Sequence, residues 1–132
     1  MSIASNFVRG ALALSALGFA ALVAPAASAT DHPCFFINQW QGWKADGPNT
    51  LYLRVNMRDI YRADLSAGAE QLSWAGSYHL VSRVQGSSSI CGPLDLQLAV
   101  SDGHGYYQPL IVKSLVKLTP EEAAALPPKV RP

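Results

Sequence analysis

The residues with the most specific spacing for metal chemistry are Thr30, Asp31 and His32. If the chain is cleaved after Ala29, Thr30 becomes a free N-terminus with a histidine in the third position. Its amine, the next backbone amides and the imidazole can then form a square plane of nitrogens, which suits Cu(II) or Ni(II). Neither Asp31 nor His32 is proline, so both amides can be deprotonated. The motif predicts a copper or nickel site. The simpler alternative is a histidine that occurs by chance in a flexible terminus.

Other residues capable of acid–base or metal chemistry are scattered. The 3 histidines include no pair at the H-x-H or H-x-x-x-H spacing of metal sites. Asp102 and His104 share a glycine-rich segment and could act as ligands or as an acid–base pair, although turns select aspartate and glycine without any function. Nucleophile-elbow, Walker and dinucleotide motifs are absent from the sequence. The sequence therefore favours a protein without enzymatic activity, with no catalytic residue to name and no cofactor beyond copper or nickel.

An aromatic and amide-rich segment at 38–43 contains Trp40 and Trp43. Flat rings stack on sugars and amides bond to their hydroxyls, so these tryptophans are candidates for ligand binding. A small domain also needs large side chains in its core, and Trp40, Trp43 and Trp74 can supply them. Core packing is the favoured interpretation of all three.

Residues 1–29 have the parts of a cleavable secretory signal. Arg9 supplies the positive charge, Ala11–Ala24 is an uncharged run, and Ala27–Ala29 has small residues at the cleavage positions. The run is shorter than the about 20 apolar residues of a spanning helix, and Pro25 follows it. We therefore expect an exported protein, periplasmic or secreted, with no membrane span after cleavage.

Cleavage is expected after Ala29, with Ala26 as the alternative, and leaves residues 30–132 as a single domain with a flexible terminus at 30–33. Only Arg9 of the 10 Lys+Arg lies in the leader and all 9 Asp+Glu follow it, so the mature chain carries no net charge. Lysine and arginine are also not concentrated in any segment. We expect no nucleic-acid partner, and an envelope partner or ligand recognised through shape, aromatic rings or hydrogen bonds.

The mature chain contains 2 cysteines, Cys34 and Cys91. In an oxidising compartment they are expected to form a disulfide bond. Closing a loop of roughly 58 residues stabilises a fold by about 4 kcal/mol in the chain-entropy model. The alternative is a reactive or metal-binding thiol pair, but the cysteines lack the C-x-x-C spacing and a basic neighbour.

The elements that must position these residues are expected to be mostly β-strands. Apolar residues alternate with polar ones over 50–55 and 94–100. The segment 94–100 is expected to form a hairpin around Gly103 with the apolar segment 108–118. A helix over 53–65, with an apolar residue at every fourth position, is the alternative for the earlier hairpin. The sequence predicts a small antiparallel β-barrel or sandwich of about 5–7 strands. The expected strand segments are 34–45, 50–55, 60–65, 71–76, 77–84, 94–100 and 108–118.

A short helix is expected at the C-terminus, over 119–126. Thr119 fits the N-cap, Pro120 the first helical position and Glu122 the third, which together form a capping box. Pro127 and Pro128 then end the helix. Residues 127–132 form a tail.

Four short segments of the mature chain follow a common pattern: Cys34–Phe35, Ile90–Asp95, Leu118–Glu122 and Ala125–Pro127. Through them the chain resembles a family of small secreted bacterial proteins catalogued only as a domain of unknown function. Members often carry two further cysteines, near the positions of Ala69 and Leu110, which this chain lacks. The resemblance thus leaves Cys34 and Cys91 as each other's only partner, and it implies no activity and no site residue.

The sequence as a whole predicts an exported, non-enzymatic β-domain that binds or scaffolds something in the cell envelope. A copper- or nickel-binding protein and an enzyme with an unrecognised site are the alternatives.

Overall fold

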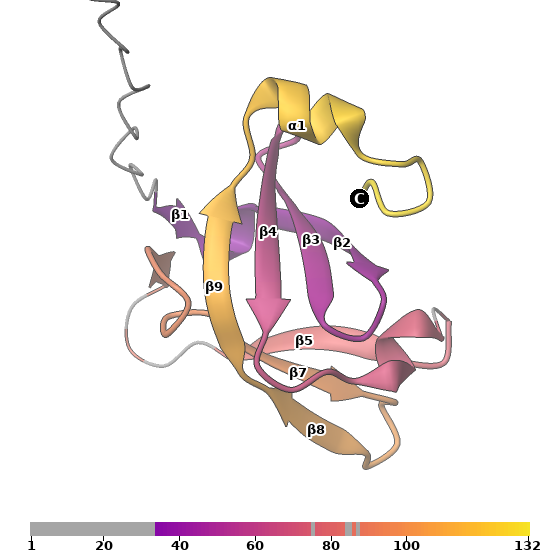
Figure 1. Cartoon of the computed structure of the whole chain (residues 1–132). Coiled ribbons are helices and arrows are strands. Elements are labelled where there is room, and N and C mark those ends of the chain that lie inside the picture. Colours follow the sequence, from indigo (N-terminus) through magenta and orange to yellow (C-terminus); the bar gives the residue numbers. More distant parts are fainter. Residues whose placement is uncertain (1–33, 75, 84–85, 87) are drawn as a thin grey trace, which may run out of the picture.

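The computed structural model describes residues 34–132, except 75, 84–85 and 87. The predicted leader and the Thr30–Asp31–His32 motif lie outside the described residues. Within them, nine strands form three antiparallel sheets, accompanied by one α-helix (Figure 1). The elements in chain order are β1 (Phe35–Phe36), the 3-10 helix η1 (Ile37–Gln39), β2 (Trp40–Asp46), β3 (Thr50–Val55), β4 (Asp59–Leu65), the 3-10 helix η2 (Glu70–Ser73), β5 (His79–Arg83), β6 (Ser89–Ile90), β7 (Gln97–Ser101), β8 (Tyr107–Leu110), β9 (Val112–Lys117) and α1 (Pro120–Ala125).

The largest sheet has the strand order β2-β3-β4-β9. The alternation predicted for 50–55 is confirmed: Leu51, Leu53 and Val55 are fully buried on one face, while Tyr52 packs in a separate cluster on the other. Strands β3 and β4 pair in register across a tight turn, so the helical alternative for this segment is wrong. Turn chemistry and the period-two apolar pattern together outweigh the fourfold spacing.

The second sheet has the order β5-β7-β8, and the hairpin predicted around Gly103 is its β7–β8 pair. In Figure 1 this sheet lies across the lower end of the upright four-stranded sheet, and residues of both sheets share one core. The arrangement is sandwich-like, with three separate sheets among the described residues. Packing two sheets on one core is how strands with a single apolar face keep that face out of water.

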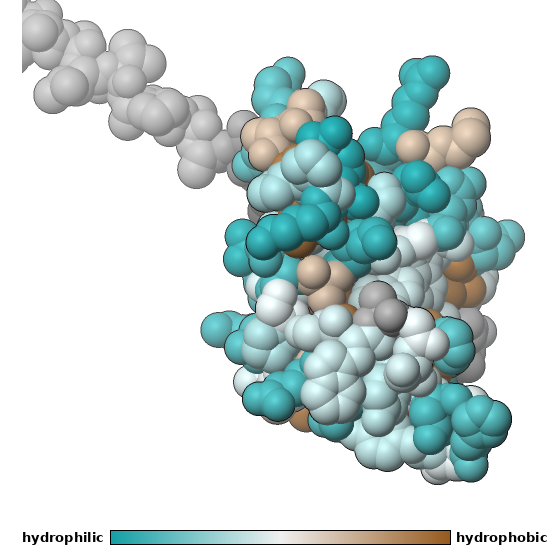
Figure 2. Space-filling view, turned by 90° about the vertical axis from the view of Figure 1, so that its right-hand side faces the viewer, coloured by the Kyte–Doolittle hydropathy of each residue, from teal (hydrophilic) through white to brown (hydrophobic). Residues whose placement is uncertain are grey.

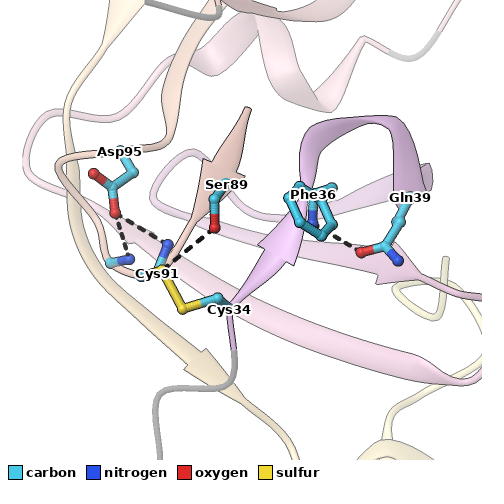
Figure 3. The surroundings of a disulfide bond; sticks show 7 residues. Cys34, Phe36, Gln39, Ser89, Cys91 and Asp95 are labelled. Carbon is cyan, nitrogen blue, oxygen red and sulfur yellow. Dashed lines mark hydrogen bonds between the residues drawn. A yellow bond between two sulfur atoms is a disulfide. The ribbon is translucent and has the colours of Figure 1, made fainter. Parts of the chain in front are cut away.

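The third sheet is the short β1–β6 ladder, and it carries the predicted disulfide bond. Phe35 pairs with Ile90, so the preceding Cys34 and the following Cys91 face each other with their Cα atoms 4.1 Å apart. Figure 3 shows the bridge at the end of this ladder. The disulfide expectation is confirmed, and it joins residues 57 positions apart in the sequence.

Several predicted strand boundaries are wrong. The segment 71–76 begins in the 3-10 helix η2 instead of a strand, and η1 interrupts the segment 34–45. The segment 108–118 divides at Ile111 into β8 and β9, which belong to different sheets. The sequence predicted about 5–7 strands. Because of these divisions and the additional strand β6, the described residues contain nine.

Leu94 does not share the buried face of its neighbours as the alternation predicted; it is 88% exposed. The carboxylate of Asp95 accepts hydrogen bonds from the backbone N–H groups of Cys91 and Gly92, both at 3.0 Å (Figure 3). This side chain holds residues 92–95 in a turn, so that β7 starts only at Gln97. Local side-chain bonds of aspartate commonly compete with strand pairing in this way.

The C-terminal helix forms as predicted. Thr119 Oγ1 accepts a hydrogen bond from Glu122 N, and Glu122 Oε2 accepts one from Thr119 N. The chain beyond α1 then returns over the second face of the large sheet, where Val130 is buried with Tyr52 and Ile60. Among the described helices, none has both the length and the apolar character needed to cross a membrane.

Candidate binding surface

The two tryptophans singled out in the sequence, Trp40 and Trp43, both lie on the edge strand β2. Both are half-buried and pack against the main core. The indole N–H of Trp40 donates to Gly42 O at 2.9 Å, so its polar group is engaged within the strand. Their rings contribute to the core, and a role in ligand binding stays a prediction for them.

The tryptophan that the fold leaves in solvent is Trp74, which is 58% exposed. It stands at the head of a row of rings: the centre of Tyr78 lies 6.1 Å from that of Trp74, and Tyr106 lies 5.6 Å from Tyr78. Gln71 and Gln108 flank Tyr106 through hydrogen bonds. We call these five residues, Gln71, Trp74, Tyr78, Tyr106 and Gln108, the aromatic–amide surface.

The first part of this surface is positioned by η2 and the turn that follows it. Leu72 is buried in the main core and anchors η2. Trp74 N then donates to Gln71 O, and Ser77 N donates to Trp74 O, which closes a tight turn. Gly76 has φ 117°, a conformation that residues with a side chain rarely adopt. The chain therefore turns back into β5 with Trp74 outside and Tyr78 against the core.

The second part is positioned by the loop between β7 and β8. Asp102 Oδ1 accepts hydrogen bonds from the backbone N–H groups of His104 at 2.8 Å and Tyr106 at 2.9 Å. These bonds hold the pKa of Asp102 below its usual value, and the bond from His104 has the larger effect. Asp102 is therefore engaged in fixing the loop and, with it, the place of Tyr106.

The predicted pair Asp102–His104 thus lies together in one loop, but the carboxylate contacts the backbone of His104. His79 lies on β5 opposite Ser101, the residue before Asp102, and is exposed. The described residues contain no group of three or more histidine, cysteine or acidic side chains suited to a metal ion.

A directional chain of hydrogen bonds crosses the surface. Gln71 Nε2 donates to Tyr106 Oη at 2.9 Å, and Tyr106 Oη donates to Gln108 Oε1. A tyrosine hydroxyl has a single proton, so it accepts from one amide and donates to the other. Within the part of the chain that the structure describes, the side-chain oxygen of Gln71 and the side-chain NH₂ group of Gln108 accept or donate no other hydrogen bond, so they can bond to a ligand.

The aromatic–amide surface is electrically neutral, because none of its five side chains carries a charge at pH 7. Figure 2 looks onto the side of the molecule where Figure 1 places η2 and the tip of the β7–β8 hairpin. The lower half of that face is mostly pale, the colour of intermediate hydropathy, with hydrophilic residues at its margins (Figure 2). Rings with polar edges, such as those of tyrosine and tryptophan, suit a ligand that is itself both apolar and polar.

A separate feature is a groove of about 350 Å³ along β7 and β8. Its walls are mostly apolar, and the exposed side chains of Leu94 and Ile111 stand at it. Arg83 lies over the ring of Tyr107, 5.4 Å from its centre, and both residues line the groove. The groove offers apolar contact area, whereas the aromatic–amide surface combines rings with aligned donors and acceptors.

Sequence reasoning missed both surfaces. It assigned Trp74 to the core, although Trp74 falls in a Ser- and Gly-rich segment, Ser73–Ser77, outside any apolar alternation. That setting is a signal of a loop residue. Comparison of the chain with protein-family models, with curated proteins and with solved structures gives no match.

Proposed function

We propose that the chain is an exported, non-enzymatic binding module of the cell envelope, periplasmic or secreted, and that it holds its ligand on the aromatic–amide surface. The secretory pattern of residues 1–29 and the disulfide bond between Cys34 and Cys91 support this location, since disulfides persist in oxidising compartments. The observation that carries the binding role is the exposure of Trp74 at the head of a row of rings.

Exposed aromatic rings favour binding for two physical reasons. Covering a tryptophan side chain removes up to about 250 Å² of its surface from contact with water. A ligand that covers an exposed tryptophan therefore gains binding free energy. The ring also has few rotatable bonds, so little conformational entropy is lost when a ligand immobilises it. Trp74 is moreover held by the hydrogen-bonded turn between η2 and β5, which reduces the cost of ordering further.

The proposal is tested by nuclear magnetic resonance on the exported protein, with its disulfide bond intact. Titration with a solubilised envelope fraction is expected to shift the amide signals of Gln71, Trp74, Tyr78 and Tyr106 in a saturable manner. The Trp74→Ala protein is expected to lose this response. The Leu94→Ala protein is the matched control, because Leu94 is an exposed apolar residue of the groove. Shifts that cluster around Leu94, or no shifts at all, would contradict the proposal.

A further inference from the structure

The chemistry of the aromatic–amide surface restricts the class of its ligand. Trp74 offers a flat apolar face, and the hydrogen-bond chain through Tyr106 ends in a free acceptor at Gln71 and free donors at Gln108. A purely apolar partner would cover these amide groups without bonding to them, and each unsatisfied group would weaken binding. A charged partner would meet no opposite charge among the five side chains. The ligand must therefore be neutral and must present both apolar faces and hydrogen-bonding groups.

We infer that this ligand is a neutral carbohydrate, with one pyranose ring stacked on Trp74 and hydroxyl groups bonded to the amides of Gln71 and Gln108. This inference rests on the binding role proposed above. The C–H faces of a pyranose are apolar and flat enough to lie on an indole ring. Each hydroxyl both donates and accepts, so neighbouring hydroxyls satisfy an acceptor at one end of the surface and a donor at the other.

The direction of the hydrogen-bond chain does not affect this match. If both amides were turned over, Gln108 would donate to Tyr106 and Gln71 would receive its proton, and the two ends of the surface would exchange roles. A hydroxyl pair fits either arrangement, because one end always accepts and the other always donates. Because Tyr106 has a single hydroxyl proton, one end of the surface accepts and the other donates whichever way the amide atoms are assigned.

The dimensions of the surface favour a short glycan over a single sugar. The ring centres of Trp74, Tyr78 and Tyr106 follow one another at 6.1 and 5.6 Å. Each step is similar to the length of one sugar residue in an extended chain. Tyr78 and Tyr106 are half-buried, and the hydroxyl of Tyr106 is bonded to both amides, so Trp74 offers the main stacking face.

The test measures binding of the exported protein to the envelope fraction before and after mild periodate oxidation, which cleaves the vicinal diols of sugars. We expect oxidation to abolish binding where the bound sugars carry vicinal diols. Trp74→Ala is expected to weaken binding to the untreated fraction at least about tenfold, and Gln108→Met, which removes the amide donors, by roughly three- to tenfold. Leu94→Ala is expected to bind as the wild type does. Neutral 1,4-linked oligosaccharides of glucose, which carry vicinal diols, and of N-acetylglucosamine, whose inner residues carry none and resist oxidation, serve as purified probes, and at least one of them is expected to compete with the fraction for binding.

The possible outcomes separate the two proposals. Binding that survives oxidation, still requires Trp74 and is not competed by either purified oligosaccharide would overturn the carbohydrate and indicate a protein or lipid ligand, while the binding role stands. Loss of binding on oxidation together with loss in Trp74→Ala supports both. If the untreated fraction binds Trp74→Ala as tightly as the wild type, the aromatic–amide surface is not the site and both proposals fail.

Discussion

At the scale of single residues, side chains that could do chemistry are used to hold the backbone in place. Asp102 receives two backbone N–H groups of its own loop, and Asp95 does the same beside the disulfide bond. Asp64 accepts hydrogen bonds from Thr50 on β3 and Ser114 on β9, so it joins three strands of the large sheet. Burial opposes ionisation of Asp64, but its hydrogen bonds and the guanidinium of Arg62 still hold its pKa below the usual value.

The loop that carries Tyr106 is predicted to depend on the charge of Asp102. Because hydrogen bonds lower the pKa of this carboxyl below its usual 3.8, its contribution to loop stability is fully present above pH 3.8 and is lost as the pH falls through the lower folded-state pKa. In a pH titration followed by nuclear magnetic resonance, the amide signals of His104 and Tyr106 should move together, with a midpoint below 3.8. A midpoint at or above that value would contradict the assignment.

The variant Asp102→Asn provides the matching control for this titration. It keeps the size of the side chain and removes its titration, so the acid-dependent movement of the His104 and Tyr106 signals should disappear. Ligand binding by the wild type should stay constant from neutral pH down to about pH 5, because the carboxylate is ionised throughout that range.

At the scale of elements, the loop from β4 to η2 passes very close to the turn between β2 and β3. Ala69 N donates to Pro48 O at 3.0 Å, and Leu65 N donates to Asn49 O at 2.8 Å. A Cβ atom on Gly68 would overlap Asn49 Oδ1 and lie 2.7 Å from Pro48 O. The side chain of Asn49 can move, but the carbonyl of Pro48 is held by its hydrogen bond.

Gly68→Ala is therefore expected to lower the free energy of unfolding by about 1–3 kcal/mol, the range for overpacking a tight contact. Gly42→Ala is the matched control: its Cβ would lie 3.7 Å from Arg54 Nη2, an ordinary contact. That substitution should leave stability unchanged or raise it slightly, since alanine suits a strand better than glycine. Denaturant unfolding measures both, and equal effects of the two substitutions would show that the close approach at Gly68 is not tight in solution.

At the scale of the whole molecule, three sheets and a C-terminal segment are held on one main core and one smaller cluster. The short β1–β6 ladder contributes Phe35 and Ile90 to the main core, and the ring of Phe35 lies 4.7 Å from that of Tyr61. The disulfide bond closes the end of this ladder. It thereby ties the start of the described chain to the segment that leads into β7.

The double variant Cys34→Ser/Cys91→Ser is expected to lose about 4 kcal/mol in the free energy of unfolding, since the open chain regains the entropy of a long loop. Both cysteines are exposed, so the serines are hydrated and add little cost of their own. Urea unfolding of oxidised wild type against the variant checks this value. Reduced wild type should unfold with the variant, and a loss below about 1 kcal/mol would mean that the bridge does not constrain the unfolded chain as the entropy model requires.

Local sequence determined much of this protein, because local physics decides it. Alternating apolar residues specified β3 and β4, turn residues specified the hairpins, and Thr119 with Glu122 specified the start of α1. The pairing of Cys34 with Cys91 also followed from the sequence, since the chain has no other cysteine. Each of these features depends on neighbouring residues or on residue type alone.

The tertiary structure alone decided which side chains form the candidate site. Trp40, Trp43 and Trp74 have the same chemistry, but the packing of the sheets places the first two, half-buried, against the core and leaves Trp74 exposed. Gln71 and Tyr106 come from segments far apart in the chain and meet because the β7–β8 loop returns beside η2. The loop setting of Trp74 leaves a local signal, but contact between side chains from distant segments is a property of the assembled core.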